Sequence, residues 1–453
     1  MSEPPSREID VDATERVQVP SYPPPFGIVR DARRALCCGG RRLDELLATA
    51  GVPTPAYVYD LDAIGLGART MVDALGRSGL CCYAIKANHA APIVGRLLLE
   101  RCGVDVVSGG ELQLALACGA EPSRIVYSGV AKRDDELDLA IRTRIRAIHA
   151  ESVEELDRIA VRARALGAQV PIGIRVNPDV EADTHSHIAT GHDEAKFGIA
   201  RDDLGRALDC VRGHGDALRL VGMSVHVGSQ LMTPEPYVAG VRVLCELAVA
   251  VRNKGFPLQY VDAGGGFGVA YRDDHRPTPP ATFIHAALAE LHARRLDDLA
   301  FVIEPGRALV AAHGVLVTRT IQPKRARGRG GERRWLLIDA GMNDLIRPAL
   351  YQAHHRIEPI VIDAKETVVS WRVAGPVCES SDDFGLHPLP DPPPPILAIR
   401  DAGAYGRSMA STYNARPIAS EVFVAGGEVI AVRRAQALDA LVADEIDGVL
   451  ARG

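Results

Sequence analysis

The sequence predicts an α/β protein that consists of a (β/α)₈ barrel and a smaller, mainly antiparallel β domain. Two observations support this fold class. Eight short apolar runs occupy the middle of the chain, with helix-length segments between most of them. Past Leu309 the pattern changes to short strand-like runs separated by turns. Continuous runs rich in Val and Ile are typical of parallel strands covered on both faces, and eight strands alternating with helices form a barrel.

Each of the eight runs is followed by a polar residue or leads into glycine. The runs are 80–85 before Lys86, Gly103–Val107 before Ser108, Ile125–Tyr127 before Ser128, Ile145–Ile148 before His149, Ile172–Val176 before Asn177, Val221–Val225 before His226, Tyr260–Asp262 before Gly264, and Phe301–Ile303 before Glu304. The chemistry of such a barrel lies at the carboxyl ends of its strands, where these residues fall.

The segments between the runs have helical periodicity. Glu151–Leu166 carries an apolar stripe, and Ser152 with Glu155 three residues later fits a capping box. Asp134–Ile141 and Pro236–Val251 behave similarly. The widest gap, between the fifth and sixth strands, contains the polar insertion Asp183–Gly191, and loops of that length are often functional.

Four regions follow from these patterns. We expect a disordered extension over residues 1–25, an N-terminal segment over 26–53 that partly joins the β domain, the barrel over 54–312, and the β domain over 313–453. The strand-like runs of the β domain are Val315–Ile321, Arg334–Ile338, Ile360–Ile362, Thr367–Val373, Ile396–Arg400, Ser420–Val424 and Val429–Arg433. Between them lie a basic, Gly-rich loop at Lys324–Arg334 and a proline run at Leu386–Pro395.

Composition excludes several classes. A chain of 453 residues with 47% hydrophobic content and net charge −6 gives no reason to expect nucleic-acid or membrane-surface binding. No stretch approaches the roughly 20 apolar residues of a membrane span, and the acidic, Pro-rich start is not a signal peptide. We expect a soluble, cytoplasmic protein. The nine cysteines have neither disulfide-framework nor zinc spacing; Cys378, in a polar stretch, is either a tolerated free thiol or functional.

Two motifs suggest a cofactor that combines an aldehyde with a phosphate. Lys86 places an amine at the end of a strand, as Schiff-base chemistry requires, although such a lysine alone is usually a solvated cation. The cluster Gly264–Gly268 fails the dinucleotide pattern, because Val269 stands where the third glycine is needed. What remains is a strand that ends in residues without Cβ, whose backbone N–H groups can approach a phosphate closely.

Taken together, six strings resemble the pyridoxal-phosphate decarboxylases that are built like alanine racemase, known as fold type III, and among them diaminopimelate decarboxylase most closely. The resemblance extends from about Thr54 to Val424, and the run Asp339–Tyr351 is similar to that enzyme and unlike ornithine and arginine decarboxylases. The six strings are Tyr83–Asn88, His226–Gln230, Gly264–Gly268, Glu304–Arg307, Cys378–Ser380 and Gly403–Gly406.

The resemblance implies pyridoxal 5'-phosphate as cofactor and assigns its contacts. Lys86 would form the internal aldimine, with a pKa lowered by neighbouring charge, and Glu304 would keep the pyridine nitrogen protonated. His226 would lie against the ring face. The phosphate would be held by Ser229, Gly265, Gly266 and Tyr405.

The same resemblance implies decarboxylation of meso-2,6-diaminopimelate to L-lysine, the last step of lysine biosynthesis. The distal carboxylate would be gripped by Arg307, Arg347 and Tyr351, and Glu379 would pair with the distal ammonium. Tyr405 would also contact substrate, in either chain's site. Cys378 would reprotonate Cα, reaching with Glu379 into the partner's barrel, which implies a homodimer with composite sites. The catalytic set is Lys86, Cys378, His226 and Glu304.

Three alternatives remain open at this stage. The long N-terminal extension, the proline run at Leu386–Pro395 and the basic loop at Lys324–Arg334 leave room for a related decarboxylase of another basic or carrier-linked amino acid in secondary metabolism. A metal-dependent barrel hydrolase would use His185, His187, His226 and Asp262, but the strand-end His-x-His of the first strand is absent, and we expect no metal. A non-catalytic homologue would have lost Cys378 and the substrate arginines, which are present.

Overall fold

The computed structural model describes residues 27–180, 196–328, 331–363 and 365–450. The predicted extension over 1–25 and the polar insertion Asp183–Gly191, with His185 and His187, lie outside the described residues.

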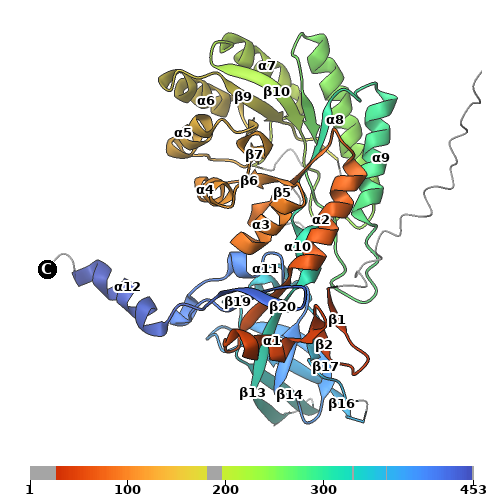
Figure 1. Ribbon diagram of the computed structural model, residues 1–453, viewed down its shortest axis with the longest axis vertical. Helices are drawn as coiled ribbons and strands as arrows, with labels where there is room; N and C mark the ends of the chain where they lie inside the picture. The colour runs from red at the N-terminus through yellow and green to blue at the C-terminus, as the bar shows by residue number, and fades with distance from the viewer. Residues whose placement is uncertain (1–26, 181–195, 329–330, 364, 451–453) are drawn as a thin grey trace, which may run out of the picture.

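Eight parallel strands close into a barrel in the upper half of Figure 1. All eight predicted runs contribute a strand, which confirms the fold class. The closed order is β10-β11-β12-β5-β6-β7-β8-β9. The strands are β5 (Leu80–Ala84), β6 (Gly103–Val106), β7 (Ile125–Tyr127), β8 (Ala147–Ala150), β9 (Val170–Arg175), β10 (Leu218–Ser224), β11 (Tyr260–Asp262) and β12 (Ala300–Ile303).

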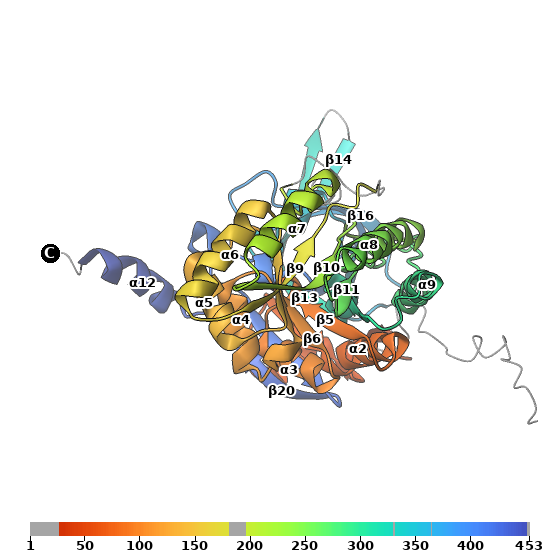
Figure 2. The ribbon, with the colours of Figure 1, turned by 90° about the horizontal axis from the view of Figure 1, so that it is seen from above.

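A ring of helices covers the outside of the barrel (Figure 2). They are α2 (Leu61–Leu75), α3 (Ala91–Leu99), α4 (Gly109–Ala117), α5 (Asp134–Thr143), α6 (Val153–Ala165), α7 (Leu204–Gly213), α8 (Glu235–Asn253) and α9 (Pro280–Ala293). Ser152 caps α6 as predicted, because its side chain accepts a hydrogen bond from Glu155 N. The Glu155 carboxylate, however, accepts from Glu151 N and Lys132.

A second, nine-stranded sheet packs below the barrel, in the order β17-β16-β14-β13-β4-β19-β20 with β18 beside β13 and β15 beside β18. Its strands are β4 (Ala56–Asp60), β13 (Gly314–Gly328), β14 (Gly331–Ile338), β15 (Ile357–Pro359), β16 (Val368–Ala374), β17 (Asp383–Pro390), β18 (Ile396–Ile399), β19 (Ser420–Ala425) and β20 (Glu428–Arg433). Most neighbours are antiparallel, but β4 runs parallel to β19, and β14 to β16.

This domain differs from the expectation in several places. β4 falls within the region expected to be barrel, yet it pairs with β13 and β19. The expected loop 324–334 is the hairpin of β13 and β14, and β17 occupies part of the expected proline run. The run expected at 360–362 gives way to β15, which ends at Pro359. A helix, α12 (Leu438–Leu450), follows the last strand and projects away from the body (Figure 1).

The N-terminal segment forms its own small sheet of β1 (Ile28–Arg30), β2 (Leu36–Cys38) and β3 (Arg41–Arg42), followed by α1 (Leu43–Ala50). Its apolar side chains share a core with the second domain, where Leu36 and Leu46 join Val315 and Val422. The segment therefore covers one face of the larger sheet.

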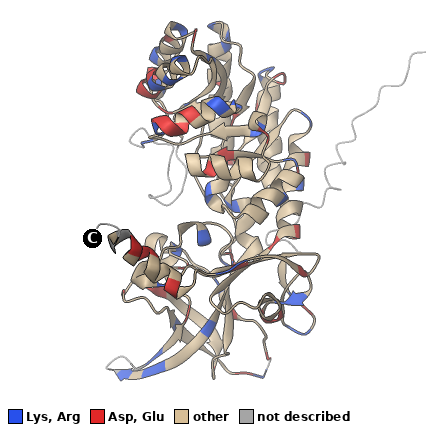
Figure 3. Ribbon diagram, turned by 60° about the vertical axis from the view of Figure 1, so that its left-hand side comes forward, with Lys and Arg blue, Asp and Glu red and all other residues tan. Residues whose placement is uncertain are grey.

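Charged residues of both signs lie on the barrel helices (Figure 3). Several form ion pairs between neighbouring helices, such as Arg162 of α6 with Asp138 of α5. Within the part of the chain that the structure describes, no helix is long and apolar enough to cross a bilayer.

Candidate active site

A pocket of about 640 Å³ opens at the carboxyl ends of the barrel strands, and both domains line it. The barrel contributes residues that follow five strands, among them Lys86, His226 and Glu304. The second domain contributes Arg347 from α11 (Arg347–Tyr351) and Tyr405 from the loop after β18. A volume of this size suits a cofactor together with a small substrate.

Lys86 lies in a 3₁₀ turn (Ile85–Ala87) that follows β5, and its side chain is 40% exposed in the pocket. Its Nζ donates a hydrogen bond of 2.7 Å to Asp105 Oδ2. Burial lowers the pKa of Lys86, but the carboxylates of Asp105 and Glu304 outweigh it, so the pKa is raised overall. The expected lowered pKa is therefore wrong for this chain without its cofactor.

Three carboxyl groups lie close together: Asp105 of β6 and Asp262 of β11, which are fully buried, and Glu304 after β12, which lines the pocket. Burial, assisted by the neighbouring Asp105, raises the pKa of Asp262 to about 7. Burial and the same two aspartates raise the pKa of Glu304 well above its usual range. Asp262 and Glu304 therefore hold a proton to higher pH than exposed carboxyl groups do.

The glycine cluster forms a tight loop beside His226. Gly266 has a φ of +95°, and a Cβ there would lie 2.1 Å from Gly228 O, so a side chain cannot be accommodated. Gly265 N–H points to His226 Nδ1 at 3.4 Å. Burial, followed by Arg175 and Lys86, lowers the pKa of His226 to about 3, so its ring is neutral at physiological pH.

Arg307 and Arg347 converge on one hydroxyl group. Arg307 Nη1 and Arg347 Nη1 donate to Tyr271 Oη at 2.8 and 2.6 Å. Arg307 also donates to Ser229 Oγ at 2.9 Å, and its guanidinium lies over the Tyr405 ring, 4.9 Å from the centroid. Both arginines are at most 9% exposed. No carboxylate of the described residues forms an ion pair with either one. Tyr351 lines the same pocket.

Cys378 and Glu379 lie elsewhere, on the exposed turn between β16 and β17. Cys378 N donates to Asn414 Oδ1 at 2.9 Å, and Tyr413 Oη donates to Glu379 Oε1 at 2.6 Å. Neither residue lines the Lys86 pocket of its own chain. The structure therefore brings together ten of the twelve predicted site residues: Lys86, His226, Ser229, Gly265, Gly266, Glu304, Arg307, Arg347, Tyr351 and Tyr405.

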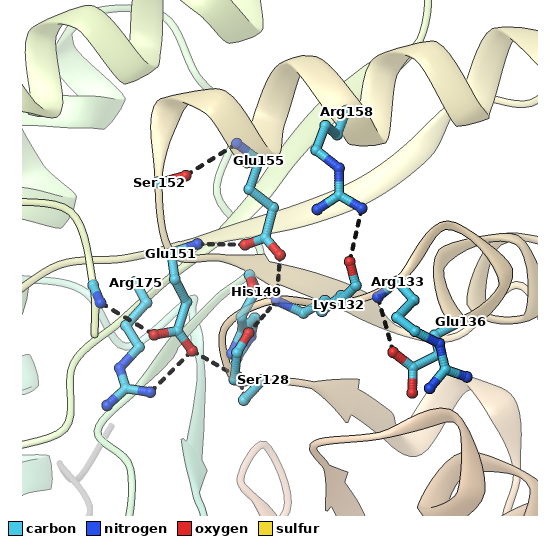
Figure 4. Close-up of polar contacts among 12 residues, drawn as sticks. Ser128, Lys132, Arg133, Glu136, His149, Glu151, Ser152, Glu155, Arg158 and Arg175 are labelled. Carbon is cyan, nitrogen blue, oxygen red and sulfur yellow. Dashed lines mark hydrogen bonds and ion pairs between the residues drawn. The ribbon is translucent and has the colours of Figure 1, made fainter. Parts of the chain in front are cut away.

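Sequence reasoning gave no role to a polar network at the ends of β7, β8 and β9 (Figure 4). Lys132 Nζ is buried and donates to Gly129 O, His149 O and Glu155 Oε1. Glu151 accepts from Arg175 Nη1 at 3.1 Å. This network joins the loop after β7, which carries Ser128, to the end of β8, which contains His149. The side chains of Ser128 and His149 lie 3.2 and 3.9 Å from Glu304 Oε1.

The structure groups other residues than those expected for a metal site. Within the described residues His226 is not part of a metal-ligating cluster, whereas ligand atoms of His149, Asp262 and Glu304 lie within 4.8 Å of one another. Ser128 Oγ donates a hydrogen bond of 3.2 Å to Glu304 Oε1, so this carboxyl group already has a hydrogen-bond partner.

Comparisons with known proteins agree with the pocket. A family model described as the pyridoxal binding domain of pyridoxal-dependent decarboxylases matches residues 61–311. Diaminopimelate decarboxylase of Zymomonas mobilis is 36% identical over 416 residues, covering 90% of this chain and 96% of the relative. That of Pseudomonas aeruginosa is 40% identical over 395 residues, covering 86% and 92%.

Solved structures give the same result. The crystal structure of diaminopimelate decarboxylase from Helicobacter pylori complexed with L-lysine matches with a TM-score of 0.81 and 36% identity, covering 90% of this chain and all of that one. With the lysine, the glycine loop and the buried carboxyl groups at one strand-end pocket, the chain is a member of the pyridoxal-phosphate-dependent diaminopimelate decarboxylase family.

Proposed function

We propose that this chain decarboxylates meso-2,6-diaminopimelate to L-lysine, with pyridoxal 5'-phosphate held at Lys86. The observation that carries the proposal is the pair of buried guanidinium groups of Arg307 and Arg347, which lack a carboxylate partner within the described residues. Buried charges are normally paired, so the pocket calls for an anionic group from the substrate. The Helicobacter pylori relative binds L-lysine, the expected product.

The arginine pair favours a substrate with a distal carboxylate. Both guanidinium groups donate to Tyr271 Oη, and a carboxylate that replaced or joined this hydroxyl would receive charge-assisted hydrogen bonds. Burial, followed by repulsion from Arg307, lowers the pKa of Arg347, which an added carboxylate would counteract. Lysine, ornithine and arginine carry no carboxylate at that end, so they would leave the charges uncompensated.

The residues around Lys86 fit the cofactor chemically. Bound pyridoxal phosphate supplies an electron-withdrawing ring that accepts the electron pair left when CO₂ departs. Lys86 would hold its aldehyde carbon, and the buried Glu304 would face its ring nitrogen. The neutral His226 would lie against the ring. Donors for the phosphate would come from Ser229, Gly265, Gly266 and Tyr405.

The acid for the final proton would come from a second copy of the chain. Cys378 and Glu379 lie on an exposed turn and not at their own pocket, which suits side chains that complete a neighbour's site. Cys378 would give its proton to Cα, and Glu379 would pair with the distal ammonium. The proposal therefore includes a homodimer with two composite sites.

A CO₂-release assay with meso-diaminopimelate, L-lysine, L-ornithine and L-arginine in parallel tests the substrate. We expect release from meso-diaminopimelate, and none from the Lys86→Ala variant. Equal release from L-lysine would refute the substrate while leaving the decarboxylase chemistry intact. Release from Lys86→Ala at the wild-type rate would refute the role of Lys86.

A further inference from the structure

Three side chains inside the barrel form a chain of hydrogen bonds that ends on Glu304. Tyr260 Oη lies 2.7 Å from His149 Nε2, and His149 Nδ1 lies 3.2 Å from Ser128 Oγ. Ser128 Oγ in turn lies 3.2 Å from Glu304 Oε1. Ser128 and His149 follow or end neighbouring strands, and Tyr260 begins β11 across the barrel.

The barrel is built to hold this chain. A Cβ on Gly222 would lie 2.1 Å from the Tyr260 ring, and one on Gly173 would lie 2.5 Å from the His149 ring and 2.8 Å from Tyr260 Oη. Neither glycine has a positive φ, so it is space and not backbone conformation that requires glycine at both positions. The adjacent strands β9 and β10 therefore have glycine at the positions that face the Tyr260 and His149 rings.

The buried Tyr260 hydroxyl determines which atom donates in each hydrogen bond of the chain. The Tyr260 hydroxyl is fully buried, and within the described residues its recorded hydrogen-bond partner is His149. If His149 Nε2 carried the proton, the hydroxyl hydrogen would be left without an acceptor, which is unfavourable in a buried site. Tyr260 therefore donates to Nε2, and neutral His149 donates from Nδ1 to Ser128.

With that direction, Ser128 has one proton left to give, and it gives it to Glu304. A carboxylate that receives a hydrogen bond is stabilised in its charged form. Glu304 needs this help, because Asp105 and Asp262 lie close and its side chain is only 10% exposed. Lys86 and Arg175 are the positive groups that face it.

We propose that Tyr260, His149 and Ser128 are positioning residues that form a hydrogen-bond relay of fixed direction, and that this relay keeps Glu304 ionised against the ring nitrogen of the cofactor. The inference rests on the proposed role of Glu304. It does not depend on which amino acid is the substrate.

The test uses the enzyme loaded with pyridoxal phosphate that carries ¹⁵N in its ring, because the ¹⁵N chemical shift reports protonation of that nitrogen directly. We expect Ser128→Ala to move the signal from the protonated toward the unprotonated position, and Tyr260→Phe to move it less in the same direction. Ser128→Thr keeps the hydroxyl group and should restore the wild-type signal. The value of kcat should fall in Ser128→Ala while KM stays unchanged.

Tyr127→Phe is the matched control, because it also removes a fully buried tyrosine hydroxyl from a barrel strand. That hydroxyl has no hydrogen-bond partner among the described residues, so the ring-nitrogen signal should not move. Glu304→Gln tests the proposed role of Glu304 separately from the relay. If Glu304→Gln leaves the signal in place, the proposed role of Glu304 is wrong.

If Glu304→Gln moves the signal but Ser128→Ala and Tyr260→Phe do not, the relay is wrong and the role of Glu304 stands. A second measurement does not depend on activity or on soluble yield of the variants. The imidazole ¹⁵N spectrum of the wild-type enzyme should show His149 with its proton on Nδ1. A proton on Nε2 would overturn the direction of the relay.

Discussion

Lys86 forms a hydrogen-bonded ion pair with Asp105, and the 2.7 Å contact joins adjacent barrel strands. Asp105 lies in β6 opposite Ala84 of β5, two residues before the lysine. Its side chain is completely buried, so solvent does not screen the carboxylate. In the protein without its cofactor, the Lys86 amine is therefore charged at neutral pH.

This pair predicts how the cofactor-free protein takes up pyridoxal phosphate. The amine must be neutral to attack an aldehyde, and Asp105 raises the pKa of Lys86, so uptake should be slow near neutral pH and accelerate as pH rises. Asp105→Asn removes the charge, lowers the pKa of Lys86 and should shift the whole uptake profile to lower pH. Stopped-flow absorbance of the bound cofactor, recorded across pH, measures this profile.

Asp73→Asn is the control, since it removes an exposed carboxylate from the end of α2 and should leave the uptake profile unchanged. An Asp105→Asn profile that coincides with that of the wild type would show that Asp105 does not govern the lysine.

The sequence predicted the barrel strands because each is a continuous apolar run. Three of the residues that follow the runs, Lys86, His226 and Glu304, line the pocket. Asp105 was missed, although a single acid within the run Gly103–Val107 is a usable signal of a buried charge with a partner. Tyr271 has no such local signal, because only the folded chain brings it between Arg307 and Arg347. The sequence did not predict β17, because its prolines argue against a strand. β17 lies at the edge of the sheet, where prolines are tolerated.

The proposed composite site predicts complementation between two inactive variants. In a mixed dimer of Lys86→Ala and Cys378→Ala chains, one site combines an intact Lys86 with an intact Cys378. Equal random mixing makes half the dimers mixed, so activity should recover to about a quarter of the wild-type value. CO₂ release after subunit exchange measures the recovery.

Exchange itself is verified with differently tagged subunits purified over both tags. Mixing Lys86→Ala with Glu304→Ala is the control, because both residues belong to the same chain's pocket. In such a mixed dimer, one pocket lacks Lys86 and the other lacks Glu304. No pocket is intact, so no recovery is expected. Absence of recovery in the Cys378 pair as well would place Cys378 outside the neighbour's site.

The buried pair of Lys132 and Glu155 predicts an effect on stability. Lys132→Met leaves the Glu155 charge buried without its partner, which typically costs about 3–5 kcal/mol. Adding Glu155→Gln removes the charge and retains an oxygen that can accept from Glu151 N, so the double variant should regain much of the loss. Urea unfolding midpoints of the wild type and both variants measure this. A double variant less stable than Lys132→Met would contradict the electrostatic explanation.

Arg347→Lys tests the substrate assignment most directly. The variant keeps a positive charge but loses the planar fork that can hold a carboxylate in a fixed orientation. For meso-diaminopimelate we expect kcat/KM to fall by about 30-fold, which corresponds to roughly 2 kcal/mol, as for one charge-assisted hydrogen bond.

Arg272→Lys is the matched control, because Arg272 lines the same pocket but is exposed to solvent, where a lysine can replace its charge. We expect it to stay within about twofold of the wild type, since exposed charges contribute little. The affinity for pyridoxal phosphate should be unchanged in both variants, because neither arginine is among the residues proposed to hold it. If Arg347→Lys processes meso-diaminopimelate as fast as Arg272→Lys does, Arg347 does not bind the distal carboxylate, and the substrate assignment loses its main structural support.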